Sequence, residues 1–238
     1  MAAAAALDTG LVVGSFGRHC LVETPEGRRI ICHPRGKKSQ VVVGDRVRWQ
    51  PTQDEGTIEK IEERRNLFYR QDEVRTKSFA ANLDQVLILI AAEPEFSESQ
   101  LSRALIAAEA EHITPIIALN KSDLVEPFER AWGRLLPYQR MRYGVLPLCL
   151  RLSGDVDRNH LLKHLEGKTT LVLGPSGAGK STLINLLVPE AGAEVGELSR
   201  ATGGARELPG LLDGAEVAIG GRRCGGGRCR GSHDGETA

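Results

Sequence analysis

Residues 174–181 are Gly174-Pro175-Ser176-Gly177-Ala178-Gly179-Lys180-Ser181. This stretch matches the phosphate-binding pattern G-x-x-x-x-G-K-[ST], and it lies between a strand-like run at 169–173 and a helical run that begins at Lys180. The glycines let backbone N–H groups converge on phosphate oxygens, and the helix N-terminus adds its positive dipole. We predict that residues 174–182, ending at Thr182, hold nucleotide phosphates, with Lys180 at the β- and γ-phosphates and Ser181 as a Mg²⁺ ligand. The alternative is a glycine-rich turn without a ligand.

A second motif distinguishes GTP from ATP. Asn120-Lys121-Ser122-Asp123 follows an apolar run at 116–119, so it lies at the carboxyl end of a predicted strand, where α/β sheets bind ligands. The Asp123 carboxylate can accept hydrogen bonds from N1–H and the 2-amino group of guanine, and adenine offers neither. Lys121 can pack along the base, and the Asn120 side chain can tie this loop to the phosphate loop. We therefore predict GTP and GDP as ligands; an ATP-dependent enzyme requires this motif to be accidental.

The wider pattern is that of an α/β domain. Apolar strand runs at 82–92, 114–119, 145–150 and 169–173 alternate with helical stretches at 97–111, 160–165 and from Lys180 onward. This alternation is typical of a parallel sheet covered by helices. The guanine loop precedes the phosphate loop, the reverse of the order in ordinary small GTPases. We predict a circularly permuted P-loop GTPase domain.

The first 61 residues follow a different pattern, with short β-rich runs at 10–13, 19–22, 29–32, 45–49 and 57–61 separated by glycine and proline turns. This spacing predicts a small closed all-β barrel of the oligonucleotide-binding (OB) type. An SH3-like barrel fits almost as well. We expect three parts: a barrel at 1–68, the GTPase domain at 69–200, and an irregular, disordered tail at 201–238 that contains only one strand-like run, Val217 to Ile219.

Composition restricts the cellular setting. The chain has 31 basic and 31 acidic residues, but residues 1–50 hold eight Arg or Lys against four acids, so the predicted barrel is modestly basic. The five cysteines, at 20, 32, 149, 224 and 229, form a poor disulfide framework and favour a reducing compartment. The start lacks the features of a secretory signal, and the longest apolar run, Val86 to Ala92, is far short of the ~20 residues of a membrane helix. We expect a soluble, cytoplasmic monomer without a membrane partner.

These residues resemble the ribosome small-subunit-dependent GTPases known as the RsgA or YjeQ family. The likeness covers roughly residues 8 to 200. Besides the two nucleotide motifs it includes Gly44-Asp45-Arg46-Val47, Arg64-Arg65-Asn66, Asn82-Leu83-Asp84-Gln85 and Val195-Gly196-Glu197-Leu198-Ser199. The resemblance implies an OB-fold barrel, a permuted GTPase domain that hydrolyses GTP, and a C-terminal zinc domain, acting together on the maturing small ribosomal subunit and its rRNA.

The resemblance also gives the barrel a candidate RNA surface. Side chains suited to base stacking and phosphate contacts are Phe16, Arg18, His19, Arg46, Arg48 and Trp49. An ordinary solvated surface is the alternative interpretation.

The chain departs from the family pattern in the third guanine-site element. A Ser-Ala-Lys-like stretch is replaced by Cys149-Leu150-Arg151, whose backbone can still face the base. We expect Cys149 to be a small buried residue rather than a nucleophile.

A larger departure follows Arg200. The family's Gly-x-His-Thr-Thr-Thr switch, Asp-x-Pro-Gly loop and zinc motif are not found in order, and Glu207-Leu208-Pro209-Gly210 resembles the second only superficially. Cys224, Cys229 and His233 are three candidate zinc ligands, whereas a structural zinc site takes four. We identify no catalytic residue. The alternative function is therefore a guanine-nucleotide binding module with little or no hydrolysis.

One hypothesis explains this abrupt change: the tail is translated out of frame. Reading the codons of Leu211-Leu212-Asp213-Gly214 one base earlier permits Thr-Thr-Arg-Trp, and the family has Thr-Arg-Trp shortly after its threonine-rich switch. The gene translated in the neighbouring frame tests the hypothesis.

Overall fold

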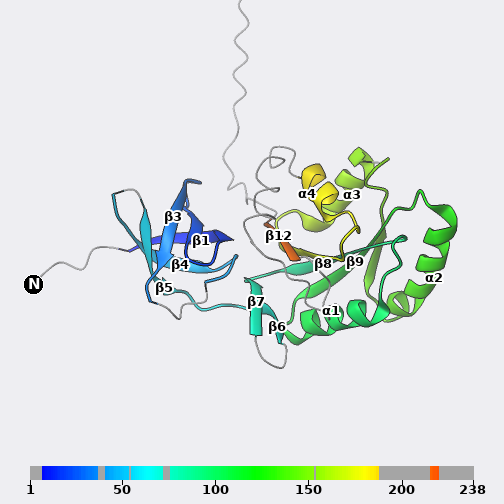
Figure 1. Cartoon of the computed structure of the whole chain (residues 1–238), viewed down its shortest axis with the longest axis horizontal. Helices are drawn as coiled ribbons and strands as arrows, with labels where there is room; N and C mark the ends of the chain where they lie inside the picture. The colour runs from blue at the N-terminus through cyan, green and yellow to red at the C-terminus, as the bar shows by residue number, and fades with distance from the viewer. Residues whose placement is uncertain are drawn as a thin grey trace, which may run out of the picture.

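The computed structural model describes residues 7–36, 41–53, 55–71, 76–152, 154–187 and 215–219. A small barrel formed by the N-terminal strands lies beside a larger α/β domain, and a two-stranded hairpin stands between them (Figure 1). The β-barrel and the α/β domain predicted from the sequence are therefore present.

Five strands close the barrel: β1 (Asp8–Ser15), β2 (Cys20–Glu23), β3 (Arg29–Pro34), β4 (Arg46–Pro51) and β5 (Gly56–Ile61). They are arranged in the order β1-β2-β3-β5-β4, and β4 pairs back onto β1. The pair β3 and β5 is parallel, whereas the other pairs are antiparallel. This closed order confirms the prediction of an OB-type barrel.

The inside of the barrel includes Trp49, which corrects its assignment to an RNA-binding surface. Its side chain is only 2% exposed and packs in the barrel core with Val12, Val22 and Cys32. A Cβ atom added at Gly56 would lie 2.5 Å from Trp49 Cε3, so glycine at this position leaves the room that the indole ring fills. Trp49 is therefore a core residue and cannot stack on a base.

The α/β domain contains a five-stranded sheet in the order β10-β9-β8-β11-β12. Its strands are β8 (Gln85–Ala91), β9 (Thr114–Asn120), β10 (Gly144–Pro147), β11 (Thr169–Leu173) and β12 (Ala215–Ile219). The first four are mutually parallel, and β12 runs antiparallel to β11. The strand β8 is buried along its whole length, as expected for a central parallel strand covered on both faces.

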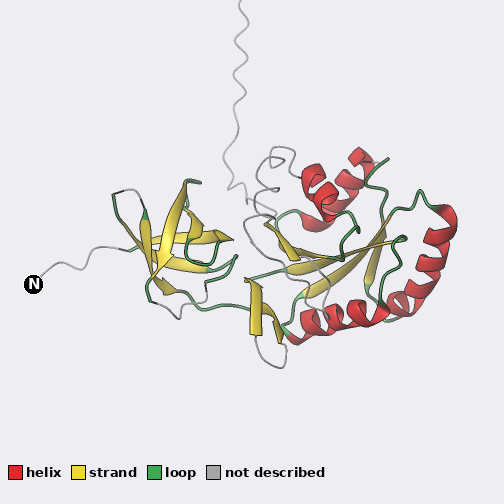
Figure 2. Cartoon of the chain, viewed as in Figure 1, coloured by secondary structure: helices red, strands yellow, loops and turns green. Residues whose placement is uncertain are grey.

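Helices cover both faces of this sheet (Figure 2). On one face, α1 (Glu98–Ala110) and α2 (Val125–Arg140) pack against Val86, Ile88 and Ile90 of β8. On the other face, α3 (Gly154–Leu165) and α4 (Lys180–Leu187) pack against Leu87 and Leu89. Alternate residues of one strand thus supply two cores, which fixes the strand's register.

Two elements were not predicted from the sequence. Helix α2 contains Pro127 and Pro137, and prolines usually interrupt a helical pattern. Pro127 lies in the first turn, where a helix needs no N–H donor, and buried Ala131, Leu135 and Tyr138 still form one apolar face. The second element is the hairpin β6 (Leu67–Gln71) and β7 (Thr76–Ala81), and the expected domain boundary at residue 68 falls inside β6.

The tail contributes one described element to the sheet. Strand β12 pairs residue by residue with β11, from Ala215 beside Leu173 to Ile219 beside Thr169. It contains the strand-like run at 217–219 noted in the sequence. The remainder of the tail lies outside the described residues, so its predicted disorder stays a prediction.

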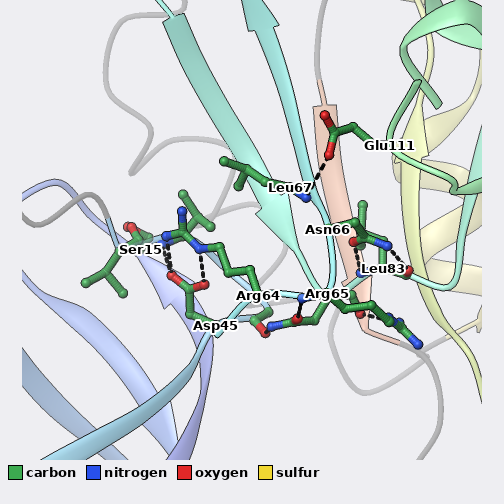
Figure 3. A network of polar contacts seen from close by, with 12 residues as sticks. Ser15, Asp45, Arg64, Arg65, Asn66, Leu67, Leu83 and Glu111 are labelled. Atoms are coloured by element: carbon green, nitrogen blue, oxygen red, sulfur yellow. Dashed lines mark hydrogen bonds and ion pairs between the residues drawn. The ribbon is translucent and has the colours of Figure 1, made fainter. Parts of the chain in front are cut away.

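The barrel and the α/β domain are joined by a network of polar contacts (Figure 3). The Asp45 carboxylate is completely buried and receives two hydrogen bonds from Arg64, Nε to Oδ1 at 2.7 Å and Nη2 to Oδ2 at 2.9 Å. Its Oδ2 also accepts the amide N–H of Val42 at 2.9 Å. This double contact is the strong geometry for an arginine and a carboxylate, and it raises the pKa of the Arg64 guanidinium.

The backbones of the two parts also meet directly. Asn82 Nδ2 donates to the carbonyl of Gly44 at 2.8 Å, and the amide of Ala81 donates to the carbonyl of Val43 at 2.9 Å. Gly44 has a φ of +90°, and a Cβ atom there would lie 2.1 Å from the Ala81 carbonyl oxygen, so only glycine fits. The junction therefore combines a close backbone approach with a buried ion pair.

Asp84 connects the junction to the strand that leads into the phosphate loop. Its Oδ2 accepts the amide N–H of Thr169, the first residue of β11, at 2.8 Å, and its Oδ1 accepts from Arg65 at 2.9 Å. The network thus ends on the amino end of β11. The candidate nucleotide loops lie at the opposite, carboxyl end of the same sheet.

Candidate guanine-nucleotide site

The two predicted nucleotide motifs lie on one edge of the sheet. The guanine loop begins at Asn120, the last residue of β9, and the phosphate loop follows β11 directly. Both strands are parallel neighbours of β8, so their carboxyl ends point the same way. The topology therefore brings together two loops that are 50 residues or more apart in sequence, in the reversed order expected of a permuted domain.

The phosphate loop has the backbone conformation that its glycines permit. Gly177 and Gly179 have φ values of +78° and +104°, a region that side-chain-bearing residues rarely adopt. A Cβ atom at Gly174 would lie 2.2 Å from the carbonyl oxygen of Leu89 in β8, so the loop passes very close to the neighbouring strand. These glycines are needed for the tight path of the chain between β11 and α4.

Lys180 begins helix α4 and folds back over the loop. Its Nζ donates to the carbonyls of Gly174 at 3.0 Å and Pro175 at 3.1 Å. Ser181 and Thr182, which follow in the first turn, are exposed. The ammonium group lies where it can exchange loop carbonyls for phosphate oxygens, because phosphates are the stronger, charged acceptors.

Asn120 joins the two loops. Its side chain is 5% exposed, and its Nδ2 donates to the carbonyl of Ala178 in the phosphate loop at 2.9 Å. Its Oδ1 accepts the amide N–H of Leu150 at 3.2 Å. A Cβ atom at Gly179 would lie 2.5 Å from Asn120 Nδ2, so this glycine admits the contact. The side-chain amide of Asn120 thus links the guanine loop to the phosphate loop and to the third element at Leu150.

Lys121 and Asp123 are the side chains expected to meet the base. Lys121 has a backbone φ of +67°. This conformation is unfavourable for a residue with a side chain, and such strained residues cluster at functional sites. The Nζ of Lys121 donates to the carbonyl of Glu93 at 2.5 Å. Asp123 is exposed, and its Oδ1 lies 3.3 Å from the Cys149 thiol, which donates to it. Ser122 donates its amide N–H to the carbonyl of Leu148 at 3.0 Å, which holds this loop against the next.

The third element, Cys149 to Arg151, lies beside these two loops. Cys149 is 8% exposed, as expected, and its amide N–H donates to Oδ2 of Asp157 at 2.5 Å. Sequence reasoning did not identify Asp157, since nothing in the motif marks a residue eight positions later as its partner. The only signal is spacing: Asp157 lies four residues before Leu161 and eight before Leu165, on the buried side of α3.

Metal ligands can be assessed only in the part of the chain that the structure describes. Within that part no three His, Cys, Asp or Glu side chains gather as a metal site. The candidate zinc ligands Cys224, Cys229 and His233 lie outside it, as do residues 207–214 and Val195 to Ser199. Among the described helices, none is both long and apolar enough to span a membrane.

The barrel surface retains part of its predicted RNA-binding set. The Phe16 ring stacks on His19, with ring centres 5.2 Å apart, and Arg18 and Arg46 are exposed. Arg48 instead pairs with Glu62 at 2.9 Å. Two further basic side chains of the barrel also have acidic partners, Arg29 with Glu23 and Arg35 with Glu59. The excess positive charge seen in the sequence is therefore partly neutralised.

Comparison with known proteins agrees with this geometry. The family model described as RsgA GTPase matches residues 61–207. A relative from Variovorax paradoxus (strain S110), named small ribosomal subunit biogenesis GTPase RsgA, is 76% identical over 195 residues, which cover 82% of this chain and 61% of the relative. A relative of the same name from Paraburkholderia phytofirmans is 48% identical over 199 residues, covering 83% of this chain and 63% of the relative. The chain thus spans about three fifths of the length of these relatives.

Two solved structures are similar over most of the described fold. YjeQ from Thermotoga maritima has a TM-score of 0.62 at 29% identity, covering 77% of this chain and 66% of that protein. YloQ, described as a circularly permuted GTPase, has a TM-score of 0.59 at 28% identity, covering 77% of this chain and 65% of that protein. The permuted order inferred from the two motifs is thus the order of a known fold.

Proposed function

This chain belongs to the RsgA GTPase family, and from that premise we propose that it binds GTP and GDP with Mg²⁺ and hydrolyses GTP while assisting maturation of the small ribosomal subunit. The observation that carries the proposal is the contact between Asn120 and the Ala178 carbonyl, which holds the base-reading and phosphate-binding loops together as one site. The names of the relatives, small ribosomal subunit biogenesis GTPase, support the cellular role.

The phosphate half of the proposed site uses residues 174–182. Backbone N–H groups of the loop and the N-terminus of α4 face the phosphates, and Lys180 neutralises charge on the β- and γ-phosphates. The Ser181 hydroxyl, exposed in the first turn of α4, fits a Mg²⁺ ligand. When bound, Mg²⁺ supplies further charge neutralisation at the phosphates.

The base half uses residues 120–123. Asp123 accepts hydrogen bonds from N1–H and the 2-amino group of guanine, and Lys121 packs its aliphatic stem along the ring. The thiol of Cys149 is a weak donor to Asp123, so the carboxylate keeps most of its acceptor capacity for the base. Adenine offers an acceptor where guanine offers a donor, and Asp123 therefore disfavours it.

We propose that the barrel contributes the contact with rRNA. Phe16 and His19 offer stacked rings beside the exposed cation Arg18, a combination suited to an unstacked base and its phosphate. We therefore expect the protein to act in the cytoplasm, with the assembling ribosome.

The test is single-turnover hydrolysis of GTP with and without purified small ribosomal subunits. We expect subunits to accelerate hydrolysis, and Lys180→Ala to abolish the reaction. The matched control is Lys168→Ala, which removes an exposed lysine just before β11 and should leave the rate unchanged. Binding of GTP without hydrolysis under either condition would instead support a nucleotide-binding module.

A further inference from the structure

We propose that Asp157 is a positioning residue for guanine recognition, acting through Cys149 on the base-reading carboxylate of Asp123. The inference rests on the proposed function, because it concerns how the same site distinguishes guanine from other bases. Asp157 itself does not touch the base in this account. It holds the loop that does.

The position of Asp157 on its helix is unusual for a carboxylate. Asp157, Leu161 and Leu165 follow one another at intervals of four on the inner side of α3, and all three are buried. Leu161 and Leu165 pack in one buried core with Leu148 and Leu150, the neighbours of Cys149 in the sequence. A core-facing position normally holds an apolar residue, because burial of a carboxylate is costly unless a donor satisfies it.

The donor is the backbone of the third guanine-site element, Cys149 to Arg151. Asp157 Oδ2 accepts the amide N–H of Cys149 at 2.5 Å, and the carboxylate is only 9% exposed. Helix α3 is anchored by its leucines, so this bond fixes the position of Cys149 relative to the sheet. This contact therefore anchors the loop that contains Cys149 to the buried core.

The fixed position of Cys149 determines two further contacts. Its Sγ lies 3.3 Å from Asp123 Oδ1 and donates to it, which orients the carboxylate. The next amide, of Leu150, donates to Asn120 Oδ1 at 3.2 Å, and Asn120 in turn reaches the Ala178 carbonyl. Asp157 is therefore the only core-anchored side chain among the described contacts of the Cys149 amide and thiol. Its removal should let Asp123 turn away from the 2-amino group of guanine.

The experiment compares GDP with inosine diphosphate, which keeps N1–H and O6 but lacks the 2-amino group. Affinities are measured by calorimetry in Mg²⁺ for the full chain and for Asp157→Ala, Asp157→Asn and Glu166→Ala. We expect the full chain to prefer GDP by roughly tenfold or more, the value of one hydrogen bond to a charged group. Asp157→Ala should reduce this preference to below about threefold, mainly through weaker binding of GDP.

The other two variants serve as controls. Asp157→Asn keeps an oxygen that accepts the Cys149 N–H, so it should restore the preference to within about twofold of the full chain. Glu166→Ala removes an exposed acid just after α3 and should change nothing. Thermal unfolding of each variant without nucleotide reports any loss of stability separately.

The possible outcomes separate the two claims. If the full chain does not bind GDP, the proposed function is wrong and this inference with it. If the full chain binds GDP but Asp157→Ala weakens both nucleotides equally, Asp157 has only a structural role and this inference alone is overturned. Should Asp157→Ala fail to fold, Asp157→Glu takes its place, since the longer side chain displaces Cys149; a preserved preference for GDP in that variant contradicts the proposal.

Discussion

The two ends of the central sheet both carry clusters of charged and polar groups, yet the clusters differ in how their charges are satisfied. At the junction with the barrel, the buried Asp45 carboxylate receives a double contact from Arg64, and Asp84 bridges Arg65 and Thr169. At this junction, charged guanidinium groups donate to charged carboxylates. Such a cluster is complete and has a structural role.

At the candidate nucleotide end, Lys180 and Asp123 each have weak partners among their described contacts. Lys180 contacts neutral carbonyls of its own loop, and Asp123 accepts from a thiol. The carbonyl contacts of Lys180 can be exchanged for phosphate oxygens at a gain in energy. Asp123 can keep its weak contact with the thiol and still accept hydrogen bonds from a base edge. The strength of the partners, more than the number of charges, thus distinguishes a structural polar cluster from a candidate binding site.

The largest effect should come from Lys180→Ala. Loss of the ammonium group removes charge-assisted contacts with the phosphates, so GDP and GTP affinity should fall by on the order of a hundredfold or more, about 3 kcal/mol. Stability without nucleotide should change little, because the bonds from the lysine to the Gly174 and Pro175 carbonyls lie within its own loop. Calorimetric titration and thermal unfolding measure the two effects. Unchanged nucleotide affinity would mean that residues 174–182 do not bind phosphates.

Arg64→Ala should give the opposite result at the junction. It leaves the fully buried Asp45 carboxylate with the Val42 amide as its remaining described partner, at a cost of about 3 kcal/mol in the free energy of unfolding. Nucleotide affinity should stay within about twofold, because the junction lies at the far end of the sheet. Urea unfolding and GDP titration test this separation.

A matched control for that variant is Arg48→Ala. Arg48 also pairs with an acid, Glu62, but the arginine is 48% exposed, so its loss should cost less than about 1 kcal/mol. An equal cost for both variants would show that burial of Asp45 does not distinguish the junction from an ordinary surface pair.

A smaller effect is expected from Asp123→Asn. An amide can donate to the 2-oxo group of xanthine where the carboxylate accepted from the 2-amino group of guanine. The preference should shift from guanosine toward xanthosine diphosphate by about tenfold, one charged hydrogen bond, without loss of the fold. Titration with both nucleotides measures the shift. Unaltered guanine selectivity would remove residues 120–123 from base recognition.

The smallest effect is expected at Cys32. Its thiol lies in the barrel core, whereas the thiol of Cys149 lies beside the candidate nucleotide site. Burial raises the pKa of Cys32 to about 11 from 9.0. A pKa raised in the folded state favours the neutral thiol, so its stabilising contribution is complete below pH 9 and is lost as the pH rises toward 11. The free energy of unfolding should drop by about 1 kcal/mol by pH 10 from this group.

Cys32→Ala is the control for this dependence. The variant should be less stable at every pH because of the lost packing, but its stability should fall less steeply between pH 9 and pH 10. Titrations of lysine and tyrosine occur in both proteins and cancel in the comparison. Parallel pH profiles for the two proteins would contradict the assignment.

Local patterns predicted much of this molecule. The five barrel strands were predicted from short β-rich runs separated by turns. The phosphate loop was predicted from glycines placed between a strand and a helix. The contact from Asn120 to the phosphate loop was also expected, because both motifs had to lie at carboxyl ends of parallel strands. These features depend on short stretches of chain whose chemistry permits few alternatives.

Features that depend on tertiary context were missed. Trp49 was assigned to the surface by residue type, although Val47 and Trp49 lie inward and Arg46 and Arg48 outward along β4, an alternation that is visible in the sequence. Helix α2 was missed because Pro137 lies within its last turn, where packing of Leu135 and Tyr138 overrides propensity. Asp157 could not be recognised because its partner is a backbone N–H, and any residue type can supply one.

We propose that residues 120–123 and 174–182 form one guanine-nucleotide site in spite of their reversed order. Its most direct test is a calorimetric titration of the full chain with GDP and, separately, ADP, both with Mg²⁺. We expect saturable binding of one GDP and an affinity for ADP weaker by on the order of a hundredfold or more, because the Asp123 carboxylate meets no donor pair on adenine. Equal affinities for GDP and ADP, or no binding of GDP, would contradict it.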